Sequence, residues 1–388
     1  MQLITYRNLT TFLLLQYCPL QPASLQQQSP RTSCQPLLSH PIMTQKALLL
    51  KEARTPLVLV DNHPIPHPDD HQIQIKVTVA GLNGHDQKIR DLGIFLSRTG
   101  VPAVLANDVV GTVVKVGNAV TSFQAGDRVV SQADFAVGTL QNGLQEYAIL
   151  DEQFTATVPS TIPDDDAATL PTNLVASLVA LFHDLPIPAP WSPEAETFDY
   201  QKSTLLIIGG GSFAGRYATQ LAKLAGIGRI VVVGGSQEVL EGYGATHVLD
   251  RHGTQDAVLE SIRAIVGDDL IYAYDAVNMP AGQLLALNAL SGHKKGYFTR
   301  LLPLPIDHAK VLNKAAGFEV GNVLGISSER PELCREFWRR VPEYLEKKLL
   351  MPMQGGYQVT SGLAADRVND ILDSFQDGGR VKHAHVHL

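Results

Sequence analysis

Hydrophobic and polar residues alternate with a period of two in HQIQIKVTVAGLN, within a mostly strand-like region between residues 46 and 165. VVGTVVKVG repeats β-branched residues, and GDRVV, LQEYAIL and FTATVP supply further short strand-like segments. Such alternation places the apolar side chains on one face of an extended chain, and Gly, Asp and Pro residues separate the segments. Short strands at this spacing predict a small β-barrel or sandwich. A different pattern follows in PDDDAATLPTNLVASLVALF, where an acidic start precedes a helical run.

Beyond a loop rich in Pro and Glu, strand and helix patterns alternate. The stretch TLLIIGGGSFAGRYATQLAKLAGIGRIVVVGGS reads as strand, glycine turn, helix, short loop and strand. The alternation continues through THVLD, DAVLESIRAIVG, LIYAYDAV, AGQLLALNALS, KKGYFTRLL and FEVGNVLG. About six strands result, which predicts a complete doubly wound parallel sheet.

The glycine turn between the first strand and helix of this region predicts a dinucleotide site. A pyrophosphate must approach backbone N–H groups at a helix N-terminus, and a Cβ atom there would block it. The spacing is looser than G-x-G-x-x-G, because counting from Gly209 brings Ala214 to the last position. A purely structural turn is the alternative, but the flanking strands and the amphipathic helix supply the context that the fingerprint requires. The expected cofactor-binding residues are Gly209, Gly210, Gly211, Ser212, Phe213, Ala214 and Gly215.

The end of the second strand bears on the choice of cofactor. An NAD site places a carboxylate here for the ribose 2′-OH, and that carboxylate would repel the 2′-phosphate of NADP. The sequence instead offers two glycines followed by Ser236 and Gln237, which can donate hydrogen bonds to a phosphate. Glu238 opposes this interpretation, although its place one turn into the helix suits the helix dipole. NADP(H) is therefore expected; Tyr243 either stacks near the adenine or is an ordinary buried aromatic.

Composition excludes several classes of protein. The 388 residues carry a net charge of −7 without basic runs, which argues against nucleic acid as a partner. Three cysteines, Cys18, Cys34 and Cys334, are too few and too scattered for a disulfide framework or a four-cysteine zinc site. No uninterrupted apolar run approaches the ~20 residues of a membrane-spanning helix. We expect a soluble protein of a reducing compartment, and cytoplasmic localisation.

Residues 1–42 differ from the rest of the chain. They contain no Asp or Glu, two Arg residues, and a stretch rich in Gln, Ser and Pro. The interpretation that we favour is a disordered or artefactual extension, because the first strand-like pattern opens at Met43 with MTQKALLL. An Arg-bearing, acid-free start is also typical of a mitochondrial transit segment.

The order of these patterns resembles the medium-chain dehydrogenase/reductases. The supporting stretches are AGLNGHDQK, AATLPTNLVASLVALFHDLPIPAP, IIGGGSFAG and QGGYQVTSGLAADRVNDILDSFQDGGRV. Within that superfamily the chain resembles the zinc-independent quinone oxidoreductase branch, and most of all the fungal trans-acting enoyl reductases. The resemblance implies an α/β protein with a GroES-like β-barrel catalytic domain (residues 43–165 plus 350–388) and a Rossmann doubly wound parallel sheet (residues 166–349).

The resemblance also bears on metal. The family places catalytic zinc on a Cys in the AGLN segment and on a His in a Gly-His-Glu segment. Asn83 occupies the first position here, and Ala106-Asn107-Asp108 occupies the second. Zinc prefers thiolate and imidazole ligands to an amide, so the expected metal is none. Asn107 and Asp108 are then expected in the substrate pocket, together with Arg300 after the fifth Rossmann strand.

Chemistry without a metal requires an acceptor that is already polarised. An α,β-unsaturated thioester, ketone or quinone spreads negative charge onto its oxygen, and hydrogen-bond donors can stabilise it. The candidate catalytic residues are Lys88, Asn83 and His85. Lys88 matches the Asn-x-x-Asp-x-Lys pattern of the enoyl reductases, but a solvated surface lysine is an equal alternative. His85 is a candidate proton donor, and Asp86 is expected to cap the following helix.

The resulting expectation is an NADPH-dependent oxidoreductase that reduces an activated C=C bond in a polyketide-like substrate of secondary metabolism. The substrate is a small molecule, either free or tethered to a carrier protein, and the enzyme is a monomer or homodimer. A quinone or carbonyl reductase on the same scaffold is one alternative, and a catalytically silent nucleotide-binding partner protein is another. Three imidazoles on the terminal strand, His383, His385 and His387, invite a metal-site interpretation that we do not favour.

Overall fold

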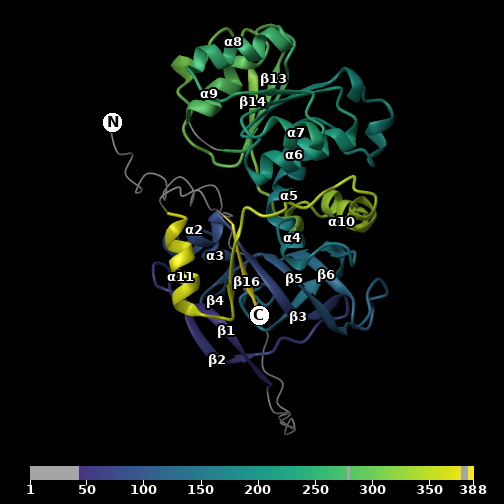
Figure 1. Ribbon diagram of the computed structural model, residues 1–388, viewed down its shortest axis with the longest axis vertical. Helices are drawn as coiled ribbons and strands as arrows, with labels where there is room; N and C mark the ends of the chain where they lie inside the picture. Colours follow the sequence, from purple (N-terminus) through teal and green to yellow (C-terminus); the bar gives the residue numbers. More distant parts are fainter. Residues whose placement is uncertain (1–42, 278–279, 377–382) are drawn as a thin grey trace, which may run out of the picture.

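The computed structural model describes residues 43–277, 280–376 and 383–388, and the predicted extension 1–42 lies outside these ranges. The chain forms two bodies, with the cofactor domain above and the catalytic domain below in Figure 1. Helices α5 (Pro171–Val179) and α10 (Pro331–Glu346) lie between them. The predicted fold class, a GroES-like barrel plus a Rossmann sheet, is confirmed.

The catalytic domain is built around strand β3 (Gln72–Leu82). Its alternating residues bury Ile73, Ile75 and Val77 on one face, as the period-two pattern predicts. In the described ranges the larger sheet has the order β15-β16-β3-β5-β6-β8, with β7 also paired to β3, and a smaller sheet has the order β2-β1-β4. The other strands are β1 Thr44–Leu50, β2 Val58–Pro64, β4 Ala103–Val104, β5 Asp108–Val116, β6 Arg128–Gln132, β7 Tyr147–Asp151, β8 Thr155–Thr157, β15 Gln358–Ser361 and β16 Ala384–His387.

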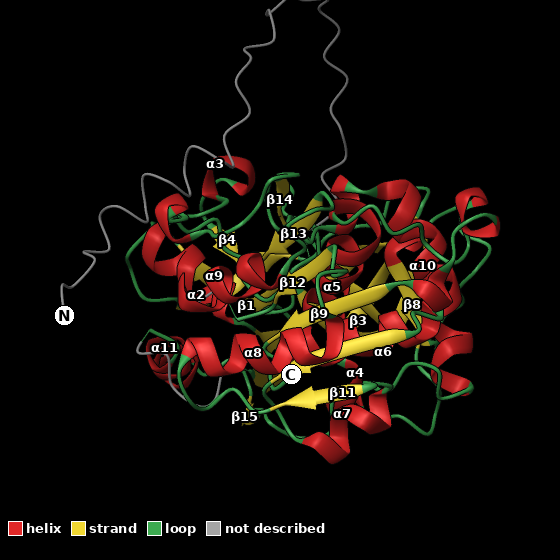
Figure 2. Ribbon diagram, turned by 90° about the horizontal axis from the view of Figure 1, so that it is seen from above, coloured by secondary structure: helices red, strands yellow, loops and turns green. Residues whose placement is uncertain are grey.

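The cofactor domain contains a parallel sheet in the order β11-β10-β9-β12-β13-β14. Strand β9 (Thr204–Ile208) lies at its centre and is apolar on both faces. Leu205 and Ile207 face the core beneath α6, whereas Leu206 and Ile208 face the core beneath α8 and α9. Helices therefore cover both faces, as a buried parallel sheet requires (Figure 2). The other strands are β10 Arg229–Val233, β11 His247–Leu249, β12 Tyr272–Asp275, β13 Gly296–Arg300 and β14 Phe318–Asn322.

The helices follow the sequence pattern with one interruption. The predicted run over residues 163–182 divides at Pro171 into α4 (Asp164–Ala167) and α5, and it ends in the π-helical turn η2 (Ala180–Asp184). The remaining helices are α2 Gly84–Leu92, α3 Leu96–Thr99, α6 Phe213–Ala225, α7 Gln237–Tyr243, α8 Gln255–Val266, α9 Pro280–Ala289 and α11 Ala365–Ser374. Short 3-10 turns are η1 Glu152–Phe154, η3 Pro193–Glu196, η4 Tyr200–Lys202, η5 His308–Lys310 and η6 Ser327–Glu329.

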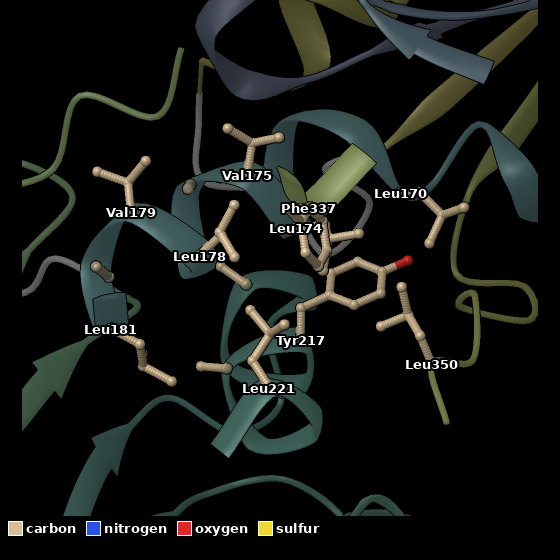
Figure 3. Packing of buried hydrophobic residues seen from close by; sticks show 14 of the residues in the cluster. Leu170, Leu174, Val175, Leu178, Val179, Leu181, Tyr217, Leu221, Phe337 and Leu350 are labelled. Carbon is tan, nitrogen blue, oxygen red and sulfur yellow. The ribbon is translucent and has the colours of Figure 1, made fainter. Parts of the chain in front are cut away.

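A shared hydrophobic core joins the two domains. Figure 3 shows Tyr217 and Leu221 of α6 beside the apolar side chains of α5, such as Leu174 and Leu178. Tyr217 is fully buried, and its hydroxyl lies 2.9 Å from the Thr169 hydroxyl. The helix that carries the glycine turn is thus fixed against the catalytic domain. Across the described ranges, no helix is long and apolar enough to cross a membrane.

Candidate functional site

The glycine turn between β9 and α6 is a close-packed cradle. Gly209 has φ +94°, a conformation that favours glycine. A Cβ on Gly210 would lie 2.3 Å from Val232 Cγ1, and a Cβ on Gly215 would lie 2.3 Å from the Gly209 carbonyl oxygen. Ser212 is the N-cap of α6 and accepts a 3.0 Å hydrogen bond from the Gly215 N–H. The turn therefore brings the N-terminus of α6 to an open surface with no room for Cβ atoms, while the N–H groups of Gly209, Gly210, Ser212 and Gly215 are already bonded within the fold.

A cavity of about 690 Å³ opens at this turn. Gly209, Gly211 and Ser212 line it on one side, and Gly234 and Gly235 line it on the other. A glycine-lined cavity at the carboxyl ends of parallel strands and at a helix N-terminus suits a dinucleotide. The residues present therefore fit a nicotinamide dinucleotide, with the turn holding its pyrophosphate.

Arg251 contributes the charge in this cavity, and the sequence reasoning missed it. Its side chain passes over Gly234, where a Cβ would lie 3.0 Å from Arg251 Cδ. Among the described residues that line the cavity, Arg251 is the only charged one. Its guanidinium makes no hydrogen bond or ion pair within the described ranges, and the adjacent Asp250 is paired with His252 at 2.7 Å. Strand register could have located Arg251. Val233 pairs with Leu249, so the residues two positions further on, Gly235 and Arg251, leave their strands at the same edge of the sheet.

The residues expected at the adenosine end occupy several environments. Ser236 is the N-cap of α7, and Gln237 donates a 2.7 Å hydrogen bond to Glu241 on the same helix. The Tyr243 hydroxyl lies 3.8 Å from Met353 Sδ, and its ring packs against the large core between the domains. These three side chains follow the cavity wall in sequence but are not among its lining residues.

A buried polar cluster surrounds the first turn of α2. Asn83 is the N-cap residue, and its backbone N–H donates a 2.7 Å hydrogen bond to Asp86, as expected for a capping carboxylate. The Asn83 amide Nδ2 donates to Asp108 Oδ2 at 2.8 Å, and the Thr172 N–H donates to Asp108 Oδ1 at 2.8 Å. Burial raises the pKa of Asp108 to about 6, although the hydrogen bonds from Thr172 and Asn83 oppose the shift. Asn83, at the position of the family's zinc-binding Cys, is thus hydrogen-bonded to Asp108, the neighbour of Asn107 at the position of the zinc-binding His.

His85 and Lys88 lie on the same short helix. His85 Nε2 is 3.0 Å from Asn107 Oδ1, and Asn107 Nδ2 donates to the Ala133 carbonyl. Because the Asn107 oxygen must then accept, a neutral His85 carries its proton on Nε2. The ring packs edge-on against Phe135 with 5.9 Å between centroids. Lys88 is partly exposed, and its Nζ donates a 3.0 Å hydrogen bond to the Gly84 carbonyl.

Two further residues join this cluster: Asn173, which the sequence reasoning missed, and His383, which it considered only as a possible metal ligand. Asn173 of α5 donates from Nδ2 to Asn83 Oδ1 at 3.0 Å and to His383 Nε2 at 2.8 Å. The His383 ring stacks on Phe213, the first residue of α6, with 4.5 Å between centroids. Burial, together with nearby His385 and His85, lowers the pKa of His383 to about 3. His383 therefore connects the glycine turn with the polar cluster as a neutral imidazole.

Arg300 lies outside this cluster. It ends β13 and is only 6% exposed, and burial lowers its pKa. Its guanidinium donates to Gln283 Oε1 at 2.6 Å and to Asn322 Oδ1 at 2.9 Å. These bonds join neighbouring elements of the cofactor domain. Within residues 43–277, 280–376 and 383–388, no group of three or more His, Cys, Asp or Glu side chains is arranged to hold a metal ion.

Comparisons with known proteins agree with this architecture. Residues 69–160 match the alcohol dehydrogenase GroES-like domain. The chain is 28% identical over 305 residues to the trans-enoyl reductase fsr4 of Gibberella fujikuroi, covering 75% of this chain and 85% of the relative.

Two solved structures share the fold. The CurK enoyl reductase aligns with a TM-score of 0.68 at 18% identity, covering 88% of this chain and 99% of that chain. Mycobacterial Rv1454c, solved in complex with NADPH, aligns with a TM-score of 0.66 at 21% identity, covering 89% of this chain and all of that chain. The chain therefore carries an alcohol dehydrogenase GroES-like domain, shares the overall fold of these oxidoreductases, and is similar in sequence to trans-enoyl reductases.

Proposed function

We propose that this oxidoreductase uses NADPH to reduce a C=C bond conjugated to a carbonyl or thioester in a polyketide-like small molecule, without a metal ion. The observation that carries the proposal is the glycine-lined cavity with Arg251 as its charged wall. The name of the relative fsr4, a trans-enoyl reductase, supports the choice of an enoyl acceptor. The NADPH complex of the fold neighbour Rv1454c supports the choice of coenzyme.

The cavity supports NADPH over NADH on electrostatic grounds. The adenosine 2′-phosphate carries negative charge, and an Arg guanidinium matches phosphate geometry with paired N–H donors. No carboxylate lines the described part of this cavity to accept from a ribose 2′-OH. Gly209–Gly215 would hold the pyrophosphate, while Arg251 and the start of α7 would meet the 2′-phosphate. When bound, NADPH supplies the hydride.

The polar cluster at the start of α2 supplies the other half of the chemistry. Asn83, Asn173 and His85 bring amide and imidazole groups together beside the helix that carries the glycine turn. Hydrogen-bond donors fixed in place stabilise negative charge on an oxygen without the cost of reorientation. His85 could donate a proton only from its imidazolium form, because its Nε2–H is engaged by Asn107 in the neutral form. A second proton source is water at the partly exposed Lys88.

In this proposal the reaction needs no metal ion, because the side chains at the family's zinc-site segments are already hydrogen-bonded to one another. Asn83 and Asp108 satisfy each other, and Asp108 also accepts from the Thr172 backbone. A zinc ion would have to break these buried hydrogen bonds and accept an amide ligand, which zinc disfavours. The proposal therefore assigns charge stabilisation to hydrogen-bond donors.

The test follows a labelled hydride. Purified, chelator-treated enzyme is incubated with NADPH deuterated at C4 and with an enone or an enoyl thioester, free and carrier-bound. Deuterium in the product at the carbon β to the carbonyl supports the proposal. Label on an alcohol carbon would indicate a carbonyl reductase, and a hydroquinone formed from added quinone without enone reduction would indicate a quinone reductase. Absence of transfer to every acceptor, or a requirement for added Zn²⁺, would overturn it.

A further inference from the structure

Strand β16 and the residue before it carry three histidines on one face. Residues two apart on a strand point to the same side, so His383, His385 and His387 share a direction. His383 is 6% exposed and His385 is fully buried, whereas His387 is partly exposed. Asp165 lies beside them, with its Oδ1 2.8 Å from His385 Nδ1 and 2.9 Å from His387 Nε2.

The proton of His385 can be assigned from its partner. Burial disfavours ionisation of Asp165, but hydrogen bonds from His387 and His385 outweigh it and lower the pKa of Asp165. A carboxylate only accepts hydrogen bonds, so His385 Nδ1 must carry the proton. Burial also lowers the pKa of His385, which favours the neutral ring. Its Nε2 is consequently a bare acceptor.

The proton of His383 can be assigned in the same way from the other end of the cluster. Asn83 Nδ2 donates to the Asp108 carboxylate, which leaves Asn83 Oδ1 as an acceptor for Asn173. Asn173 must then direct its NH₂ group toward Asn83, and the same nitrogen lies 2.8 Å from His383 Nε2. An amide nitrogen only donates, so His383 Nε2 is bare and Nδ1 carries the proton.

These two assignments leave a matched donor and acceptor inside the protein. His383 Nδ1 and His385 Nε2 are both buried and have no hydrogen-bond partner among the described residues. Their rings are nearly perpendicular at 88°, with 6.3 Å between centroids. Two hydrogen bonds of about 2.9 Å that meet at a water oxygen near the tetrahedral angle bridge nitrogens roughly 4.5–5 Å apart, a separation compatible with this centroid spacing. Buried water typically occupies such polar gaps and satisfies groups that would otherwise be unpaired.

We propose that one water molecule bridges His383 Nδ1–H and His385 Nε2, and that His383 is a positioning residue that orients Asn173 and, through it, Asn83. The bonds form a continuous chain from Asp165 through His385, the water, His383 and Asn173 to Asn83 and Asp108. Each member fixes which atom of the next one donates. The amide of Asn83, at the start of α2, is thereby held in one orientation by a carboxylate at each end of the chain.

The first test reads the tautomers directly. Imidazole ¹⁵N signals of uniformly ¹⁵N-histidine-labelled, ligand-free protein are assigned with His383→Phe and His385→Phe, at neutral pH. We expect His383 to be protonated at Nδ1 and His385 at Nδ1, with a bound water resolved between them in a crystal structure. His387→Phe is the matched control, because it removes only the exposed contact to Asp165 and is expected to leave the His383 signals in place. Protonation of His383 at Nε2, or a protein atom in place of the water, would overturn the proposal.

The second test separates positioning from packing. His383→Phe keeps a ring against Phe213 but removes the acceptor for Asn173, whereas His383→Gln restores an acceptor without a ring. We expect kcat for enone reduction to fall roughly tenfold in the Phe variant, the effect of one lost hydrogen bond, and to recover to within about threefold in the Gln variant. This readout assumes the proposed function, whereas the tautomer measurement does not. Equal loss in both folded variants would overturn the positioning role.

Discussion

Removal of the Arg251 side chain is expected to weaken NADPH binding selectively. The guanidinium lines the cavity beyond Gly234 and has no partner in the described part of the chain that would compensate for its loss. Arg251→Ala leaves the Gly209–Gly215 turn untouched, and Arg251 is exposed, so the fold is expected to tolerate the change. Under the proposed assignment, the substitution deletes only the contact with the 2′-phosphate.

The magnitude follows from the chemistry of the pair. A hydrogen-bonded charge pair contributes about 1.5–3 kcal/mol, and exposure of Arg251 to solvent places the effect toward the low end. The Kd for NADPH is therefore expected to rise roughly ten- to thirtyfold. The Kd for NADH is expected to change by less than about twofold, because NADH has no 2′-phosphate.

Coenzyme fluorescence titration measures both constants without any turnover. Arg229→Ala is the matched control, because Arg229 is an exposed arginine at the start of β10, and the cavity lies at the other end of that strand. Raising the salt concentration should weaken wild-type NADPH binding more than that of the variant. Arg251→Glu should reverse the preference toward NADH, since a carboxylate accepts from the ribose hydroxyl and repels phosphate. Equal weakening of both coenzymes, or no change in either, would refute the assignment of Arg251 to the 2′-phosphate.

Three other predictions concern packing and pH. Gly210→Ala places a Cβ 2.3 Å from Val232 Cγ1 and is expected to abolish coenzyme binding and to cost about 1–3 kcal/mol in urea unfolding. Gly242→Ala, with open space around the added Cβ, should stabilise the protein by roughly 0.5–1 kcal/mol. An equal loss of unfolding free energy in the Gly210 and Gly242 variants would contradict the steric argument. Because the pKa of His383 falls from 6.5 to about 3 on folding, its stabilising effect is complete above pH 6.5 and is lost as pH falls toward 3. His383→Phe should reduce the slope of the unfolding free energy against pH, in the acid range, by up to one proton. An unchanged slope would contradict burial as the cause of the lowered pKa. Arg300→Met should lower the unfolding free energy by roughly 2–4 kcal/mol without raising KM, whereas a selective rise in KM would place Arg300 against the substrate.

Patterns among residues close together in sequence predicted several parts of the fold. The period of two located β3, and the glycine spacing located the turn before α6, because both depend on residues that are neighbours in sequence. The contact between Asn83 and Asp108 was not predicted as such. The resemblance nevertheless placed both residues at one site, so their proximity was an expectation.

Other features depend on pairings that periodicity does not encode. Arg251 reaches the cavity because β10 and β11 are in register, and His383 reaches Asn173 because β16 returns to the catalytic sheet. The helical run after residue 163 divides at Pro171, since proline lacks an N–H and suits the first position of a new helix. Each of these outcomes is set by tertiary contacts.

The return of β16 to the catalytic sheet also constrains the order of folding. His385 of β16 pairs with Gly81 of β3, and the entire parallel sheet lies between them in the chain. During synthesis the cofactor domain can complete its strands and pack. One edge of β3 stays unpaired until its partner β16 is synthesised, about 300 residues later. Until β16 is made, that edge of β3 offers unpaired N–H and C=O groups to which another strand could bind, so early pairing with a wrong strand is a hazard of this chain order.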